Sequence, residues 1–111
     1  MNEQLAHLRR EYTFGGNASL ISEVLADVPA LYPLLTEAVS PIHAAFGQEK
    51  RLHLEALESD DDKVLRVIIR LPLNTPRAGD LMREFKQEWW LENCSRSEAS
   101  LVFDYETGNG I

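Results

Sequence analysis

The sequence is poor in the residues and motifs that most directly indicate chemistry. Cys94 is the only cysteine among 111 residues, so no disulfide can form within the chain and a reducing compartment is expected. No apolar run approaches the roughly 18 residues of a membrane span, and the N-terminus lacks the apolar core of a signal peptide. The motifs G-x-x-x-x-G-K-[ST], G-x-G-x-x-G and H-E-x-x-H are absent as well. The sequence therefore predicts a cytoplasmic protein with no membrane segment and no cofactor.

Clustered positive charge is also lacking. The chain has 11 Lys and Arg against 18 Asp and Glu, a net charge of −7. Nonspecific binding to nucleic acid requires Lys and Arg to neutralise phosphates, so no nucleic-acid partner is expected, and a basic protein partner is favoured. With 44% hydrophobic residues, we expect one globular domain over 1–111, with an amphipathic N-terminal lead at 1–16 and a loose tail at 107–111.

The first half of the chain is predicted to be helical. From residue 19 to residue 46 apolar residues recur at alternating spacings of three and four, which is typical of one buried helix face. Pro29, Pro33 and Pro41 each remove a backbone donor from this segment, so a single straight helix is excluded. We expect two or three short helices, the last of them ending at Gly47.

The second half is predicted to form strand, strand, helix, strand. Arg51–Glu58 and Val64–Leu71 alternate with period two around an Asp-rich turn, which indicates a hairpin. Thr75 is expected to cap a helix that runs to Asn93 and precedes a last strand at Ala99–Glu106. This order predicts a two-layer α+β sandwich with a three-stranded antiparallel sheet in the order 2-1-3, since the helix would return the last strand beside the first.

One face of this sheet is expected to remain open to solvent. Leu57, Ile68 and Val102 alternate with the core positions and should lie together there, available to a partner or to a second copy of the chain. The polar residues of the face are predicted to be Arg66 and Arg70 on one edge, His53 and Glu55 in the middle, and Asp104 and Glu106 on the other edge.

Candidate catalytic or metal-binding residues are few. His53, Glu55 and Asp104 would lie near one another on the open face, where a carboxylate could orient the histidine as a base or ligand. On a solvent-exposed sheet face, however, residues of these types are more often surface charges of both signs with no chemical role. His7 and His43 fall in other elements, without the spacing of metal ligands. The sequence therefore predicts no catalytic residue and no metal site.

The helix at 75–93 contains both tryptophans. At 100° per residue Trp89 shares a stripe with Phe85 and is predicted to lie in the core, whereas Trp90 points about a quarter-turn away, towards Lys86. Two interpretations of Trp90 are open. It packs against the connection at 93–97, or it is presented with Lys86 to a partner, because tryptophan is enriched at binding hot spots.

The same helix and the strand after it contain a recognisable sequence pattern. It reads F-x-x-E-W-W-L over Phe85–Leu91 and is followed by a strand with Leu101, Phe103, Asp104 and Glu106. This pattern resembles a family of small uncharacterised bacterial proteins, although Gln87 stands where that family usually has an acidic residue. The resemblance implies a bacterial source and no known activity.

The sequence thus favours a non-enzymatic protein-binding module in the manner of an antitoxin or immunity protein. The alternative is a small enzyme or a ligand- or metal-binding domain that uses His53, Glu55 and Asp104 on the open sheet face. A homodimer through that face is also left open. The residues predicted to make interactions are Trp90, Lys86, Arg66, Arg70, Ile68 and Val102.

Overall fold

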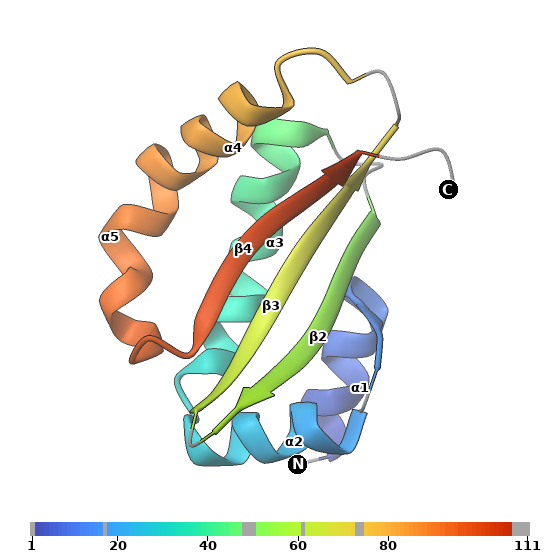
Figure 1. Ribbon diagram of the computed structural model, residues 1–111, viewed down its shortest axis with the longest axis vertical. Helices are drawn as coiled ribbons and strands as arrows, with labels where there is room; N and C mark the ends of the chain where they lie inside the picture. Colours follow the sequence, from blue (N-terminus) through green and yellow to red (C-terminus); the bar gives the residue numbers. More distant parts are fainter. Residues whose placement is uncertain (1, 17, 48–50, 61, 73–74, 108–111) are drawn as a thin grey trace.

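The computed structural model describes residues 2–16, 18–47, 51–60, 62–72 and 75–107. Helices lie on one side of an open four-stranded sheet, which confirms the α+β class (Figure 1). In chain order the elements are α1 (Asn2–Glu11), β1 (Thr13–Phe14), α2 (Ala18–Asp27), α3 (Leu31–Phe46), β2 (Arg51–Ser59), β3 (Asp62–Leu71), α4 (Ala78–Phe85), a π-helical turn (Lys86–Trp90), α5 (Leu91–Asn93), a 3-10 turn (Cys94–Ser97) and β4 (Leu101–Thr107).

The sheet is mixed and has the strand order β1-β2-β3-β4, so the prediction of three antiparallel strands in the order 2-1-3 is wrong. Only β2 and β3 are antiparallel; β1 is parallel to β2, and β4 is parallel to β3. The reason lies at the outer edge of β2, where Thr13 pairs with His53 and the Gly15 N–H donates to the Leu54 carbonyl at 2.9 Å. β1 thus occupies part of the edge of β2 beside which β4 was expected, and β4 pairs with β3.

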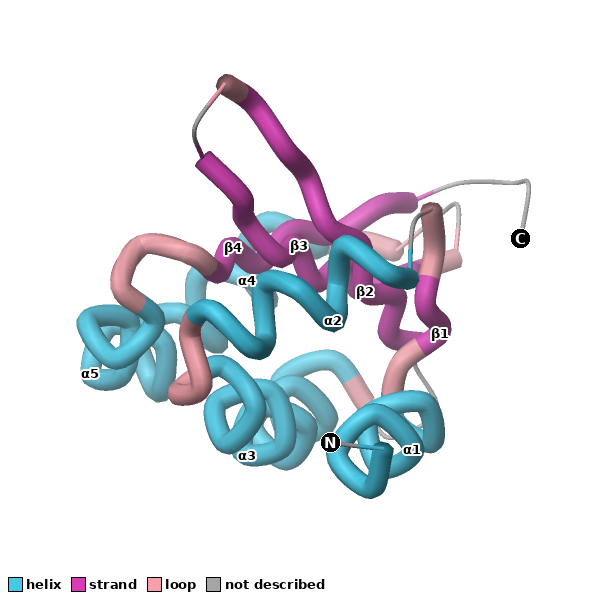
Figure 2. Tube along the Cα trace, turned by 90° about the horizontal axis from the view of Figure 1, so that it is seen from below, coloured by secondary structure: helices cyan, strands magenta, loops and turns pink. Residues whose placement is uncertain are grey.

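The core lies between the sheet and the helices. Figure 2 shows α3 in the middle of the helical layer, with α1 on one side and α5 on the other. The sheet face predicted to be covered is covered, and its side chains are buried: Leu52, Leu54, Val67, Ile69, Leu101 and Phe103. From α3 the buried residues are Leu31, Leu34, Leu35, Ala38, Ile42 and Phe46.

The helical segment at 19–46 is two helices, as its prolines predict. α2 and α3 meet at 109°, with Pro29 in the break between them. Pro33 lies in the first turn of α3, where a missing N–H costs little, whereas Pro41 lies inside the helix, which continues past it. Gly47 ends α3 with φ 111°, and its N–H donates to the His43 carbonyl at 2.8 Å. The predicted C-terminal glycine is confirmed.

α1 is part of the core, because the amphipathic lead packs on α3. Leu8 and Tyr12 are buried, and the Tyr12 hydroxyl donates to the Leu35 carbonyl at 2.7 Å. Burial raises the pKa of the Tyr12 phenol above its usual value, and the nearby charge of Glu11 adds to this.

The β2–β3 hairpin is confirmed. Ser59 pairs with Asp62, and Asp60 has φ 50°, as a tight two-residue turn requires. β4 begins at Leu101 rather than Ala99, because Glu98 and Ala99 have left-handed φ values of 53° and 63°. The predicted tail falls mostly outside the described residues, and Thr107 belongs to β4.

The predicted cap of the tryptophan helix is wrong. The helix begins at Ala78, after Arg77 in a left-handed conformation with φ 61°. The Thr75 hydroxyl instead donates to the Pro72 carbonyl at 2.8 Å and closes a local turn. Because the helix begins at Ala78, the N-cap position falls on Arg77, and Thr75 lies two residues too early to cap it.

Candidate functional site

The open face of the sheet carries a row of ion pairs that runs across three strands. Glu55 on β2 accepts from Arg66 on β3 at 3.3 Å, and Arg66 also donates to Asp104 on β4 at 3.0 Å. The His53 Nε2 atom lies 3.7 Å from the Glu55 carboxylate. Arg66 is therefore in the middle of the sheet, and the predicted separation of basic and acidic edges is wrong because β3, not β2, lies beside β4. The charges of this face are mostly neutralised within the chain.

His53 is held in place by β1. Its side chain is 13% exposed, and a methyl group added at Gly15 would overlap the imidazole ring. The sequence-predicted group His53, Glu55 and Asp104 is thus brought onto one face, but Arg66 separates the two carboxylates and pairs with both. In this arrangement one guanidinium group holds both carboxylates in a charge network across three strands.

The predicted apolar cluster of the open face is not formed as expected. Ile68 is only 3% exposed, because it pairs with His53 and Asp104 and has an arginine two residues away on each side. Leu57 and Val102 are 45% and 44% exposed. Val102 thus remains a candidate contact, whereas Ile68 is covered by its neighbours on this face.

Arg70, also predicted to make interactions, lies in register with Arg51 on β2 and Glu106 on β4. Its Nε atom is buried and has no hydrogen-bond partner among the described residues. The side chain itself is partly exposed, so a solvent molecule can reach the rest of the guanidinium group.

A π-helical turn changes the assignment of the two tryptophans. Because Lys86–Trp90 forms this turn, the helix contains an extra residue there and its faces rotate. Trp89 and Trp90 are both partly buried and stack on each other, with ring centroids 5.9 Å apart. Trp90 lies edge-on to Phe103 at 4.7 Å, closer than Trp89 at 6.1 Å. The prediction that only Trp89 faces the core is wrong.

Two grooves flank α3 on the side of the helical layer that faces away from the sheet. The α1–α3 groove has a volume of about 480 Å³ and is lined by His7, Glu11, Thr36, Val39, Ser40, His43 and Ala44. The α3–α4 groove has a volume of about 210 Å³ and is lined by Pro41, Ala44, Ala45, Glu84, Phe85, Glu88 and Trp89. Ala44 lines both, so the grooves are neighbours; together they are called the α3 surface below.

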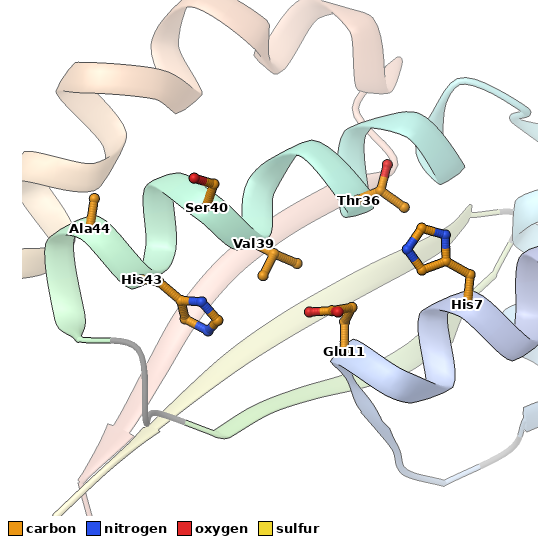
Figure 3. A pocket seen from close by; sticks show the side chains of 7 residues that line it. All are labelled: His7, Glu11, Thr36, Val39, Ser40, His43 and Ala44. Carbon is orange, nitrogen blue, oxygen red and sulfur yellow. The ribbon is translucent and has the colours of Figure 1, made fainter.

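Figure 3 shows how the α1–α3 groove is built. Glu11 points from α1 towards α3, while Val39 and His43 point from α3 towards α1. Within α1, His7 is fixed by a 2.9 Å hydrogen bond between its Nδ1 atom and the Tyr32 hydroxyl. Tertiary structure thus brings two histidines of different elements to one groove, although no three His, Cys, Asp or Glu of the described residues are placed to hold a metal ion.

The α3 surface is acidic. Glu11, Glu84 and Glu88 line it, and no lysine or arginine is among the described residues of either groove. Glu37, which is also exposed on α3, differs because Arg96 donates to both of its carboxylate oxygens at 3.0 and 2.9 Å. These hydrogen bonds hold the pKa of the Glu37 carboxyl below its usual value. The groove carboxylates are therefore the ones available to a ligand.

Sequence reasoning missed the α3 surface because its residues come from three helices whose packing no periodicity specifies. One signal was present: small residues, Ser40 and Ala44, occupy the outward positions of an otherwise bulky helix. Lys86, proposed with Trp90 as a contact, lies at the start of the π-helical turn and is not among the residues that line the α3–α4 groove.

No protein-family model, curated protein or solved structure matches this chain. The resemblance to small bacterial proteins with an F-x-x-E-W-W-L helix therefore stays a prediction. No single helix of the described residues is long and apolar enough to cross a membrane; α2 and α3 would reach that length and apolarity only together, across their 109° bend.

Proposed function

We propose that this chain is a non-enzymatic protein-binding module whose contact surface is the α3 surface. The observation that carries the proposal is the combination of two adjoining grooves, an apolar lining that includes Trp89, and the carboxylates of Glu11, Glu84 and Glu88 at the rim. An apolar centre with a polar rim is the usual composition of a protein–protein interface. A π-helical turn, which contributes Glu88 and Trp89 to one groove, is also frequent at functional sites.

The alternative of an enzyme on the open sheet face is less well supported. Chemistry there would need His53 or a carboxylate to be free, whereas Arg66 engages Glu55 and Asp104 and the imidazole is packed beside Gly15. A binding protein of the antitoxin or immunity type needs no such group. Its task is to cover a partner, and small size and a net charge of −7 suit a basic partner.

Site-specific photo-crosslinking in the native host tests the proposal. The variant Ala44→p-benzoylphenylalanine places the crosslinker in both grooves, and Val102→p-benzoylphenylalanine places it on the open sheet face. We expect one protein to be captured in near-stoichiometric amount from the Ala44 position and not from the Val102 position.

Three results would contradict the proposal. Capture from the Val102 position alone would move the interface to the sheet, and self-capture there would indicate the open-face homodimer. A small molecule or metal ion retained by the purified protein in native mass spectrometry, with no protein captured at either position, would indicate the ligand-binding alternative.

A further inference from the structure

We infer that the partner segment bound by the α3 surface is a basic amphipathic helix that lies along α3, between the α1 and α4 walls, with Lys or Arg on both flanks of its apolar stripe. The inference rests on the proposed function and adds the chemical class and the orientation of the partner. Carboxylates on opposite walls of the α3 surface are its starting point, because they come from different elements: Glu11 from α1, and Glu84 and Glu88 from α4 and the π-helical turn.

The electrostatics of the surface select for positive charge. The Glu88 carboxylate makes no ion pair with a described residue, and Glu84 has only a loose one, with its Oε2 atom 4.0 Å from Arg77. No described lysine or arginine lines either groove, so the field between the walls has one sign. Three carboxylates around a concave surface, offset among the described residues only by the loose pair between Arg77 and Glu84, attract cationic groups and disfavour anionic ones.

The surface between the carboxylates is mostly apolar, and the side chains of α3 that form it are small. Val39, Pro41, Ala44 and Ala45 come from α3, and the partly buried Trp89 ring, stacked on the buried ring of Phe85, lines the α4 side. Ala44 lets another backbone approach α3 closely, while the grooves on its two sides receive larger side chains. This is the geometry in which the ridges of one helix pack into the grooves of another.

A partner helix that satisfies both features has a defined pattern. Apolar residues at positions i, i+3, i+4 and i+7 would enter the grooves on either side of Ala44. Cationic residues flanking this stripe on one side would reach Glu11, and those on the other side would reach Glu84 and Glu88. An acidic helix with the same apolar stripe would place like charges together on both walls.

Synthetic peptides of about 16 residues, long enough to form a helix, provide the probe. The first has a leucine stripe flanked by lysines on both sides, the second has glutamates in place of the lysines, and the third has the composition of the first in a scrambled order. Binding to the purified full chain is followed by tryptophan fluorescence and by chemical-shift changes of Ala44 and Ala45. We expect binding of the first peptide only, weakened by salt.

Charge variants test the orientation. Each exposed ion pair contributes about 1.4- to 5-fold in affinity, so Glu11→Gln alone and Glu84→Gln/Glu88→Gln together should each weaken binding, and the triple variant should weaken it about tenfold. The matched control is Glu58→Gln/Glu106→Gln, which removes two exposed carboxylates from the sheet instead. It should leave the affinity within a factor of about two.

Equal binding of the acidic peptide, or an equal loss from the sheet control, would overturn the charge argument. Loss of affinity from the charge variants of only one of the two walls would overturn the orientation along α3. If the peptides do not bind but the crosslinker at Ala44 still captures a protein, this inference fails and the proposed function stands. If neither happens, both fail.

Discussion

The π-helical turn predicts that two neighbouring tryptophans contribute similarly to stability. In a regular helix Trp90 would point away from Phe85, and its replacement would cost little. Here the two indoles stack on each other with centroids 5.9 Å apart, and both contact Phe103. We therefore expect Trp89→Ala and Trp90→Ala to destabilise the protein by similar amounts.

The magnitude follows from their burial. Removing a fully buried Trp side chain costs about 3–5 kcal/mol, and an aromatic pair adds about 0.5–1.5 kcal/mol. Both indoles are only partly buried, so about 2–3 kcal/mol is expected for each variant. Leu91, the next residue, is 66% exposed and serves as the control; Leu91→Ala should cost less than about 0.5 kcal/mol.

Urea denaturation followed by far-UV circular dichroism measures these differences as shifts of the midpoint at constant slope. A loss from Trp90→Ala that matches the small loss from Leu91→Ala would refute the reasoning, because Trp90 would then not pack on Phe103. The regular-helix assignment, with only Trp89 in the core, would be correct if Trp89→Ala cost more stability than Trp90→Ala by on the order of 2 kcal/mol or more. A difference of that size is expected between a buried and an exposed side chain.

Three further outcomes are expected. Gly15→Ala should destabilise the protein by about 1–3 kcal/mol in urea denaturation, because the added methyl group overlaps His53. Much of this loss should disappear when Gly15→Ala is made in a protein that already carries His53→Ala, whereas additive losses would contradict the contact. Burial raises the pKa of Tyr12, so the stability that its neutral form contributes is present below the unfolded-state pKa of about 10 and is lost as the pH rises above it. The variant Tyr12→Phe should therefore flatten the alkaline part of a curve of stability against pH. An unchanged alkaline part would refute this reasoning. The Asp104 carboxylate accepts a hydrogen bond from the backbone N–H of Tyr105 at 2.8 Å and so occupies a donor of the edge strand β4. Asp104→Ala frees this donor and should increase self-association in sedimentation. Asp104→Asn keeps an acceptor and should not.

Local patterns determined most elements of this protein. The period of two predicted the hairpin, and the period near 3.6, interrupted by three prolines, predicted two or three helices, of which the structure has two. These signals are readable because each element must turn its own apolar side to the core, whatever its neighbours are. The same logic identified the buried face of β2, β3 and β4.

Strand order and the candidate site were decided by the tertiary structure. β1 has only two residues, too few for any periodicity, yet it pairs with the outer edge of β2, and β4 lies beside β3. This strand order placed Arg66 between Glu55 and Asp104 and so paired the carboxylates of the face on which the sequence suggested chemistry. The π-helical turn likewise rotated Trp90 onto Phe103, since one extra residue in a helix changes every later direction.

The α3 surface shows the same division most clearly. The sequence by itself determined that the chain is acidic. Only the packing of α1 and α4 on either side of α3 gathered Glu11, Glu84 and Glu88 around it. Contacts between residues far apart in the chain depend on how whole elements pack, and no local pattern encodes that packing.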